Sequence, residues 1–283
     1  MKMQDWDISW NKSKISWRPK WITNGACAGL LTVMAKIPNT RDQKGREQIT
    51  AFLVTPDMPG FKVEAESLEK CGIRGTMTSR LAFHDMPVPI ENIIGPTGKG
   101  LRVALSVLDF GRTTFGATCT GASKRCVRAA VHHAKTRHQF DRLLGGFEMV
   151  KGKLANMAAL AFAMESGTYF TANLMDARAD DYMVETAMLK VFSSESLWTI
   201  VNDTIQIFGG RAYFTDHPYE RMMRDARINM IGEGANDVLM AFIALMGMRG
   251  VGYELRDLAA FQSPVKIFIM MWKQPTWQTP CWK

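Results

Sequence analysis

Hydrophobic and polar positions divide the chain into two parts with different periodicity. Between residues 21 and about 95, short apolar runs of strand-forming residues alternate with polar turns, as at Leu30–Ala35, at Ile49–Val54 and from Arg80 onward. The polar stretch NTRDQKGREQ between the first two runs is typical of a hairpin connection. Gly and Pro are frequent in this part, which favours a β-rich module.

After Gly100 the apolar residues follow helical spacing, and Ala, Met and Leu dominate. Gly145-Gly146 and the polar stretch DARADD separate the first three helical segments. The expected helices cover residues 101–137, 147–176, 181–209 and 236–249. The predicted fold class is therefore α+β, mostly α: a partial β-sheet or barrel domain followed by an antiparallel four-helix bundle.

Composition narrows the class of protein. With 283 residues, 47% hydrophobic and 22% charged, the chain is long and apolar enough for a sizeable core. Its net charge of +8 permits acidic partners, but no dense basic run is present, so we do not expect nucleic-acid binding. Five scattered cysteines without CxxC spacing favour a reduced interior. No apolar run is long enough to span a bilayer, and the N-terminus has neither a signal-peptide nor a transit-peptide pattern.

Two motifs resemble a phosphate-binding loop and a metal site, but neither has the required spacing. GPTGKG (95–100) lacks the spacing of a phosphate-binding P-loop, and we interpret it as a flexible entry to the first long helix. His132, His133 and His138 have no Asp or Glu at metal-ligand spacing. We therefore predict solvated histidines near a helix end and no metal site.

Four other motifs each allow a structural and a functional interpretation. Arg137 ends the first helix, where it either offsets the helix dipole or binds phosphate. The glycines after Gln206 favour a helix cap over close approach of a ligand. Taken alone, Trp21 favours core packing over contact with a planar heterocycle. Glu233 lies between two glycines among apolar residues, which fits either a buried structural residue or a base held against a substrate.

Taken together, these motifs resemble one family. The motifs WITNG, KCGIRG, VPIENIIGPTGKG, TRHQF, QIFGG, YERMMRDARI and EGAND occur in the order found in acyl-CoA dehydrogenases. KVFSSES and YERMMRDARI look most similar to the very-long-chain branch. The resemblance covers about residues 18–258. It implies an N-terminal helical domain, a middle β domain and a C-terminal four-helix bundle.

The chain departs from that plan at its ends. The N-terminal helical domain and the early part of the β domain have no counterpart in this sequence, so we expect a partial chain of a longer enzyme. The expected organisation is an unmatched N-terminal segment, a partial middle β domain, a helical-bundle domain and an unmatched tail, at residues 1–20, 21–95, 96–258 and 259–283.

The resemblance implies a reaction and a set of catalytic residues. Such enzymes use FAD to convert fatty acyl-CoA thioesters to trans-2-enoyl-CoA and pass electrons to an electron-transfer flavoprotein. Glu233 matches the catalytic base of the family. Some relatives carry the base on the first bundle helix, where this chain has Gly111, so Glu233 is the only candidate. The residues that match the substrate-contacting segments are Asp109, Phe110, Gly111, Arg112 and Gly234.

The resemblance also implies how FAD is bound. Trp21, Ile22 and Thr23 match the motif that lies against the flavin ring. The family grips the adenosine-diphosphate half from a neighbouring subunit, so a homodimer or homotetramer is expected. The matching residues here are Arg137, Phe140, Gln206, Ile207, Phe208, Gly209 and Gly210. A further flavin-contacting turn matches Ala235, Asn236 and Asp237. Ala235 replaces the usual threonine, which predicts the loss of one hydrogen bond, on the order of 1 kcal/mol.

Two alternatives remain at this point: an inactive fragment or assembly module of the same family, and an acyl-CoA oxidase, which passes electrons to oxygen. The sequence does not determine the acyl chain length. The expected compartment is the bacterial cytoplasm or the mitochondrial matrix. Membrane association stays open, because the tail segment VKIFIMMW (265–272) is apolar but short.

Overall fold

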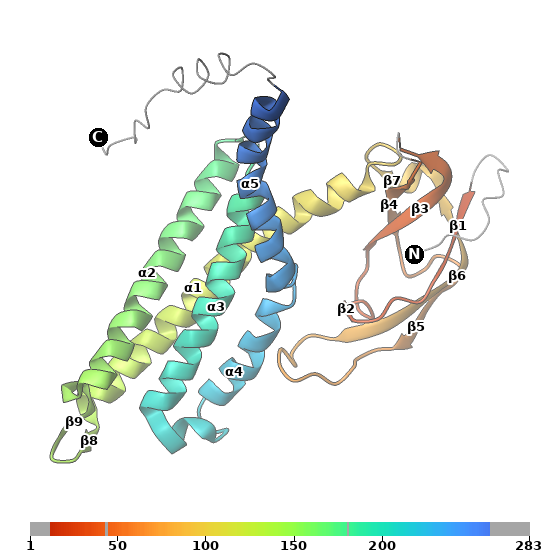
Figure 1. Cartoon of the computed structure of the whole chain (residues 1–283). Coiled ribbons are helices and arrows are strands. Elements are labelled where there is room, and N and C mark those ends of the chain that lie inside the picture. The colour runs from red at the N-terminus through yellow and green to blue at the C-terminus, as the bar shows by residue number, and fades with distance from the viewer. Residues whose placement is uncertain (1–11, 43–44, 180, 261–283) are drawn as a thin grey trace.

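The computed structural model describes residues 12–42, 45–179 and 181–260. A β-rich module is followed by an elongated bundle of helices, and one long helix joins the two (Figure 1). The predictions for residues 1–11 and for the tail beyond residue 260 lie outside the described residues. The predicted α+β, mostly helical fold class is confirmed.

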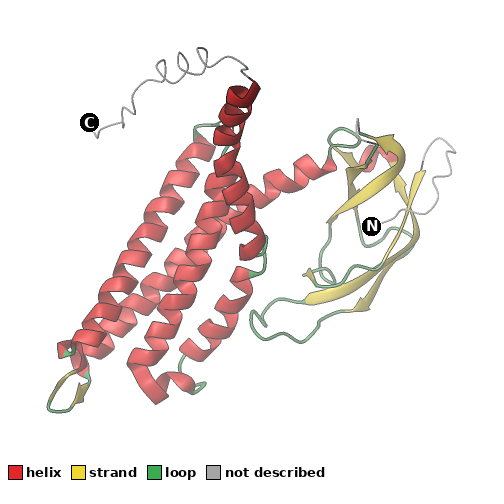
Figure 2. Ribbon diagram, viewed as in Figure 1, coloured by secondary structure: helices red, strands yellow, loops and turns green. Residues whose placement is uncertain are grey.

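The strands of the β module are antiparallel and form two sheets (Figure 2). One sheet has the order β1-β6-β2, with β5 also paired to β6, and the other has the order β3-β4-β7. The strands are β1 (Lys12–Trp17), β2 (Ile22–Thr23), β3 (Leu31–Arg41), β4 (Glu47–Val54), β5 (Phe61–Ala65), β6 (Thr78–Pro89) and β7 (Ile93–Ile94). The short 3-10 helix η1 (Ile90–Asn92) precedes β7.

Alternation of apolar and polar side chains accounts for this module. Apolar residues of β1, β3, β4 and β6 turn inward and form one core between the sheets, because successive strand side chains point to opposite faces. Ile15, Phe52 and Met86 are fully buried in it. The predicted hairpin is confirmed, since Leu31 pairs with Val54 and Lys36 with Ile49.

The helical part that the structure describes consists of four long helices and one short helix, α4. The helices are α1 (Gly100–Thr136), α2 (Glu148–Asp176), α3 (Met183–Phe208), α4 (Tyr219–Arg227) and α5 (Asn236–Ala260). Between them lie the hairpin β8 (His138–Gln139) and β9 (Arg142–Leu143) and the 3-10 turns η2 (Leu144–Gly146), η3 (Gly209–Tyr213) and η4 (Ile228–Met230). The core of α1, α2 and α3 is built from Met, Leu, Ile, Ala and two buried cysteines, Cys119 and Cys126.

Two contacts hold the β module against the helices. At the first, Gly100 lies so close to β4 that a Cβ there would be 2.5 Å from the backbone nitrogen of Ala51. The backbone N–H of Gly98 donates to Thr50 Oγ1 at 2.8 Å. The expectation of a flexible entry at GPTGKG is therefore wrong: glycine is needed there for close packing.

At the second contact, the loop that carries KCGIRG lies against α4. The N–H of Ile73 donates to Asp225 Oδ1 at 2.6 Å, and Arg224 Nη1 donates to the carbonyl of Cys71 at 2.9 Å. Among the elements that had no prediction from the sequence are α4 and the strand β1, which pairs with β6.

Candidate functional site

Glu233 lies in the turn between η4 and α5, and its carboxylate faces Gly111 in the first third of α1. A Cβ built on Gly111 would be 3.0 Å from Glu233 Oε2. Glu233 has φ +57° and Gly234 has φ +102°. A left-handed backbone is unfavourable for glutamate and persists where the surroundings hold it. Glu233 is exposed rather than buried, so the interpretation as a buried structural residue is wrong.

Arg112 holds the backbone of Glu233 from α1. Its Nε donates to the Glu233 carbonyl at 3.2 Å, and its Nη1 is 3.2 Å from Asp109 Oδ1. Thr186 on α3 donates its hydroxyl to the same Asp109 oxygen at 2.9 Å. Both charged residues are buried, with 6% and 5% of their surface exposed. The sequence predicted Asp109 and Arg112 in a substrate-contacting segment, which stays a prediction; in the structure, Arg112 binds the backbone of Glu233 and Asp109 pairs with Arg112.

Lys190 on α3 holds the next residue of the turn. Its ammonium donates to the Gly234 carbonyl at 2.6 Å and to Asn236 Oδ1 at 2.8 Å. The Asn236 amide in turn donates to Ser194 Oγ and to Glu195 Oε1. Burial, followed by the charge of Arg112, lowers the pKa of Lys190 to about 8. No role was predicted for Lys190 from the sequence. The pattern that could have indicated one is a single lysine within the apolar face of a predicted helix.

Trp21, Ile22 and Thr23 lie where the β module meets α4, and the first and third line a cavity of about 440 Å³. Trp21 is 75% exposed and has φ +63°, so packing of this ring in the core is excluded. The remaining lining comes from the KCGIRG loop, β6, α4 and the turn after it: Lys70, Cys71, Gly72, Ile73, Thr76, Thr78, Arg224, Arg227, Ile228 and Ile231.

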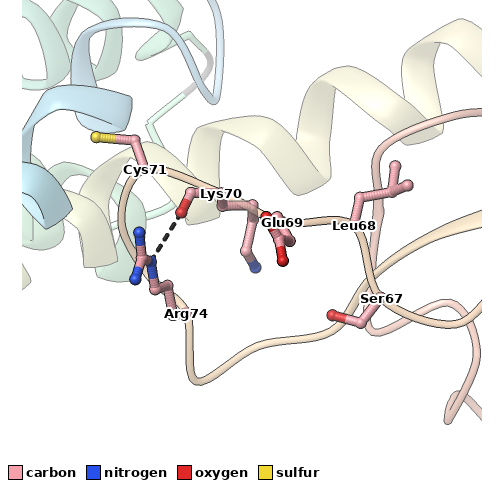
Figure 3. Close-up of a pocket in the computed structure, with 6 residues that line it drawn as sticks. All are labelled: Ser67, Leu68, Glu69, Lys70, Cys71 and Arg74. Atoms are coloured by element: carbon pink, nitrogen blue, oxygen red, sulfur yellow. Dashed lines mark hydrogen bonds between the residues drawn. The ribbon is translucent and has the colours of Figure 1, made fainter.

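The KCGIRG loop also borders a second, more polar cavity of about 520 Å³ (Figure 3). Lys70 and Cys71 line both cavities. Arg74 Nε donates to the Lys70 carbonyl at 2.8 Å, and the Lys70 ammonium donates to Thr76 and Thr78. These bonds fix the shape of the loop that forms one wall of the cavity at Trp21.

A second group of predicted cofactor residues lies at the end of the bundle where α1 and α3 finish. Arg137 follows the end of α1, where its N–H caps the helix by donating to the His133 carbonyl. Phe208, at the end of α3, stacks on His133 with ring centroids 4.2 Å apart. This stacking brings Arg137 and Phe140 to the same end of the bundle as Gln206, Ile207, Phe208, Gly209 and Gly210. His133 is half-buried by this stacking and so less solvated than predicted, while His132 and His138 are exposed.

These residues are distant from Glu233 within one chain. Twenty-six residues of α1 separate Gly111 from Arg137, or about 39 Å at the helical rise of 1.5 Å per residue. The glycines of QIFGG do form the predicted helix cap, since the N–H of Gly209, at φ +65°, donates to the Ile205 carbonyl. One copy of the chain therefore carries two separate groups of candidate cofactor residues.

Comparison with known proteins assigns the family. The description "Acyl-CoA dehydrogenase, C-terminal domain" matches residues 98–247, and "Acyl-CoA dehydrogenase, middle domain" matches residues 4–86. The chain belongs to the acyl-CoA dehydrogenase family. The middle-domain match begins within the segment for which the sequence suggested no family counterpart.

The relatives within the acyl-CoA dehydrogenase family include enzymes that are named for different acyl-CoA substrates. The chain is 38% identical to the very long-chain specific acyl-CoA dehydrogenase of Bos taurus, over 90% of this chain and 38% of that protein. It thus spans less than half the length of that curated relative. Butyryl-CoA dehydrogenase from Megasphaera elsdenii superposes with TM-score 0.76 and 33% identity, over 82% of this chain and 60% of that one.

A third relative is an acyl-CoA dehydrogenase complexed with FAD from Bacillus anthracis. It superposes with TM-score 0.78 and 32% identity, over 89% of this chain and 45% of that one. Within the part of the chain that the structure describes, no helix is both long and apolar enough to cross a membrane. The same residues contain no cluster of three or more His, Cys, Asp or Glu suited to a metal ion.

Substitution of Gly111 tests the contact between α1 and the candidate base. Gly111→Ala is expected to raise helix stability by roughly 1 kcal/mol, because glycine is a poor helix former. Its Cβ displaces the Glu233 carboxylate, so any turnover that uses Glu233 as the base should fall by about 10-fold or more. Gly121→Ala is the matched control, because nothing lies within 4 Å of a Cβ there. Urea unfolding and turnover of both variants provide the comparison, and equal activity would contradict the contact.

The pH dependence of stability tests the burial of Lys190. Its folded pKa of about 8 lies below its ordinary value of 10.5, so the unfolded chain binds more protons between these values. The cost of burying the ammonium is fully present below pH 8 and is relieved as pH rises toward 10.5. Relative to Lys190→Met, the wild-type chain should gain on the order of 1–3 kcal/mol of unfolding free energy across this window. A constant difference would contradict the lowered pKa.

Proposed function

We propose that this chain takes part in FAD-dependent α,β-dehydrogenation of fatty acyl-CoA thioesters to trans-2-enoyl-CoA. The observation that carries the proposal is the placement of the Glu233 carboxylate against Gly111. Glu233 follows Ile231 by two residues, and Ile231 lines the cavity at Trp21. A side chain at position 111 would fill the space in front of the carboxylate. Glycine leaves that space to a substrate.

The residues around the Trp21 cavity fit a flavin ring. The exposed indole of Trp21 provides a flat face and Thr23 a hydroxyl, while Ile73, Ile228 and Ile231 add apolar wall. Arg227 brings positive charge to the same wall, whereas Arg224, which also lines it, is paired with Glu220. When bound, FAD would supply the acceptor for the hydride that leaves the substrate β-carbon. Ile22 and the turn formed by Ala235, Asn236 and Asp237 are proposed to contribute to the same site.

Glu233 is proposed as the base that removes the α-proton of the thioester. A base needs a fixed position within hydrogen-bond reach of the proton it takes. Arg112 fixes the Glu233 carbonyl, and Asn236 begins α5 immediately beyond the turn. Phe110 is 58% exposed beside Gly111 and is available for substrate contact, as are Gly111 itself and Gly234.

The separation of the two groups of cofactor residues favours assembly of a homodimer or homotetramer. Arg137, Phe140 and the residues Gln206 to Gly210 would then hold the adenosine-diphosphate half of a cofactor that belongs to another copy. We further propose an electron-transfer flavoprotein as redox partner. The compartment follows the host, either the bacterial cytoplasm or the mitochondrial matrix.

The visible absorption spectrum of the purified chain, before and after addition of FAD, is the first test. A flavin spectrum that is altered by acyl-CoA, followed by enoyl-CoA formation, is the expected result. A colourless protein after FAD addition would reject the proposal for this chain and favour the assembly-module alternative. Oxygen consumption without an electron-transfer partner would instead identify an oxidase. Acyl-CoAs of graded length would define the chain-length preference.

A further inference from the structure

A buried ammonium group, that of Lys190, lies behind the Glu233 turn. Lys190 is 0% exposed and is among the largest fully buried side chains. None of the ion pairs within the described residues includes it. Removing an ammonium from water without a directly paired carboxylate is unfavourable, and an apolar side chain at this α3 position would be less costly.

The hydrogen-bond acceptors of Lys190 show which segment its ammonium group fixes. Both acceptors, the Gly234 carbonyl and Asn236 Oδ1, belong to the short segment that follows Glu233, and neither is on α3 itself. From α1, Arg112 binds the carbonyl of Glu233. Two cations on different helices thus bind consecutive carbonyl groups, those of residues 233 and 234.

These two bonds oppose a backbone preference. Glu233 at φ +57° has a conformation that side chains other than Gly, Asn and Asp rarely adopt. Rotation of the peptide units back to negative φ would break the bonds to both cations. Both bonds are charge-assisted, and the one from Lys190 is short at 2.6 Å, so they stabilise the unfavourable conformation against this rotation.

We propose that Lys190 is a positioning residue, which keeps the carboxylate of Glu233 against Gly111 by fixing the Gly234 carbonyl and the Asn236 side chain. The inference rests on the proposed role of Glu233 as the base. Because the Lys190 side chain is fully buried and bonded to the turn, it acts through the turn. The coupling has an electrostatic side as well, because the negative charge of Glu233 raises the pKa of Lys190, against the larger lowering by burial and Arg112.

The test compares Lys190→Met with a control, Lys124→Met, in the full chain. Lys124 is a lysine on α1 whose partly exposed side chain pairs with Glu165 on the bundle surface. The first measurement is hydrogen exchange of the backbone amides of residues 231–239, which requires no cofactor. Lys190→Met should accelerate this exchange by about 10-fold or more, while exchange in β3 and β4 and in the contact between α1 and α2 stays unchanged. Lys124→Met should alter neither.

Unchanged exchange of residues 231–239 in Lys190→Met would overturn the proposal. If Lys190→Met accelerates exchange throughout the chain, Lys190→Gln is measured next. This variant keeps a hydrogen-bond donor without the charge, and the expected result is again faster exchange confined to residues 231–239. A general acceleration in that variant too would show that Lys190 supports the bundle as a whole and would also overturn the proposal.

Steady-state kinetics give the second measurement. Lys190→Met should lower kcat by about 10- to 100-fold, as expected for a displaced catalytic group. KM should change by less than about threefold, because the loss is not one of substrate binding. An effect on KM alone would overturn the positioning role. If the wild-type chain shows no dehydrogenation at all, the proposed function fails, whereas the exchange measurement still decides whether Lys190 fixes the turn.

Discussion

Glu233→Gln is expected to lower the rate of enoyl-CoA formation by roughly 10²- to 10⁴-fold, the range for loss of a general base. The amide keeps the size of the carboxylate but cannot accept the α-proton. Cofactor binding should be unaffected, because Arg112 and Lys190 bind backbone carbonyls of the turn and not the Glu233 side chain. The measurements are turnover with an acyl-CoA and the visible spectrum of the FAD-loaded protein.

Glu148→Gln serves as the control for this substitution. Glu148 is an exposed carboxylate at the start of α2 that forms a surface ion pair with Lys151, one helical turn away. Its replacement should leave turnover and spectrum unchanged. Near-normal enoyl-CoA formation by Glu233→Gln would contradict the assignment of the base. Loss of the flavin spectrum would instead show that the side chain contributes to the cofactor site.

Periodicity was sufficient to predict most of the fold. Four of the α-helices and the β3–β4 hairpin follow from apolar spacing, because each element buries one continuous face. The helix α4 was not predicted, since YERMMRDAR has few apolar residues. It is held by Arg224 and Asp225, which bind the backbone of a loop about 150 residues earlier, and no local pattern reveals such a contact.

The candidate site was predictable only in part. The position of Glu233 between glycines indicated a special turn, and its φ of +57° agrees with that. The sequence could not show that Trp21 is exposed, because an aromatic residue beside a strand more often packs in a core. Nor could it show that Lys190 reaches the same turn, since this depends on the close packing of α3 and the start of α5. The assignment of the cofactor and substrate residues stays a prediction.

Gly72→Ala is expected to separate the KCGIRG loop from α4. A Cβ at position 72 would lie 2.3 Å from the carbonyl oxygen of Arg224 and 2.7 Å from the backbone nitrogen of Asp225. Backbone atoms of a helix cannot give way as a flexible side chain can, so the loop itself must move. Ile73, a β-branched residue at φ +47°, would lose the bond from its N–H to Asp225 that holds it in this unfavourable conformation.

The displaced loop would cost about 1–3 kcal/mol of unfolding free energy, as other cases of overpacking do. It would also open the cavity at Trp21, because Gly72 and Ile73 form part of its wall. We therefore expect weaker FAD binding in a flavin titration together with a lower urea midpoint.

Gly75→Ala separates this effect from a general effect of alanine in the loop. Gly75 belongs to the same motif, and nothing lies within 4 Å of a Cβ built on it. Its replacement should leave both measurements close to wild type. If the two variants behave alike, the contact between the loop and α4 does not shape the cavity. If Gly72→Ala lowers stability but binds FAD normally, the contact joins the two modules, and the flavin ring lies elsewhere than beside Trp21.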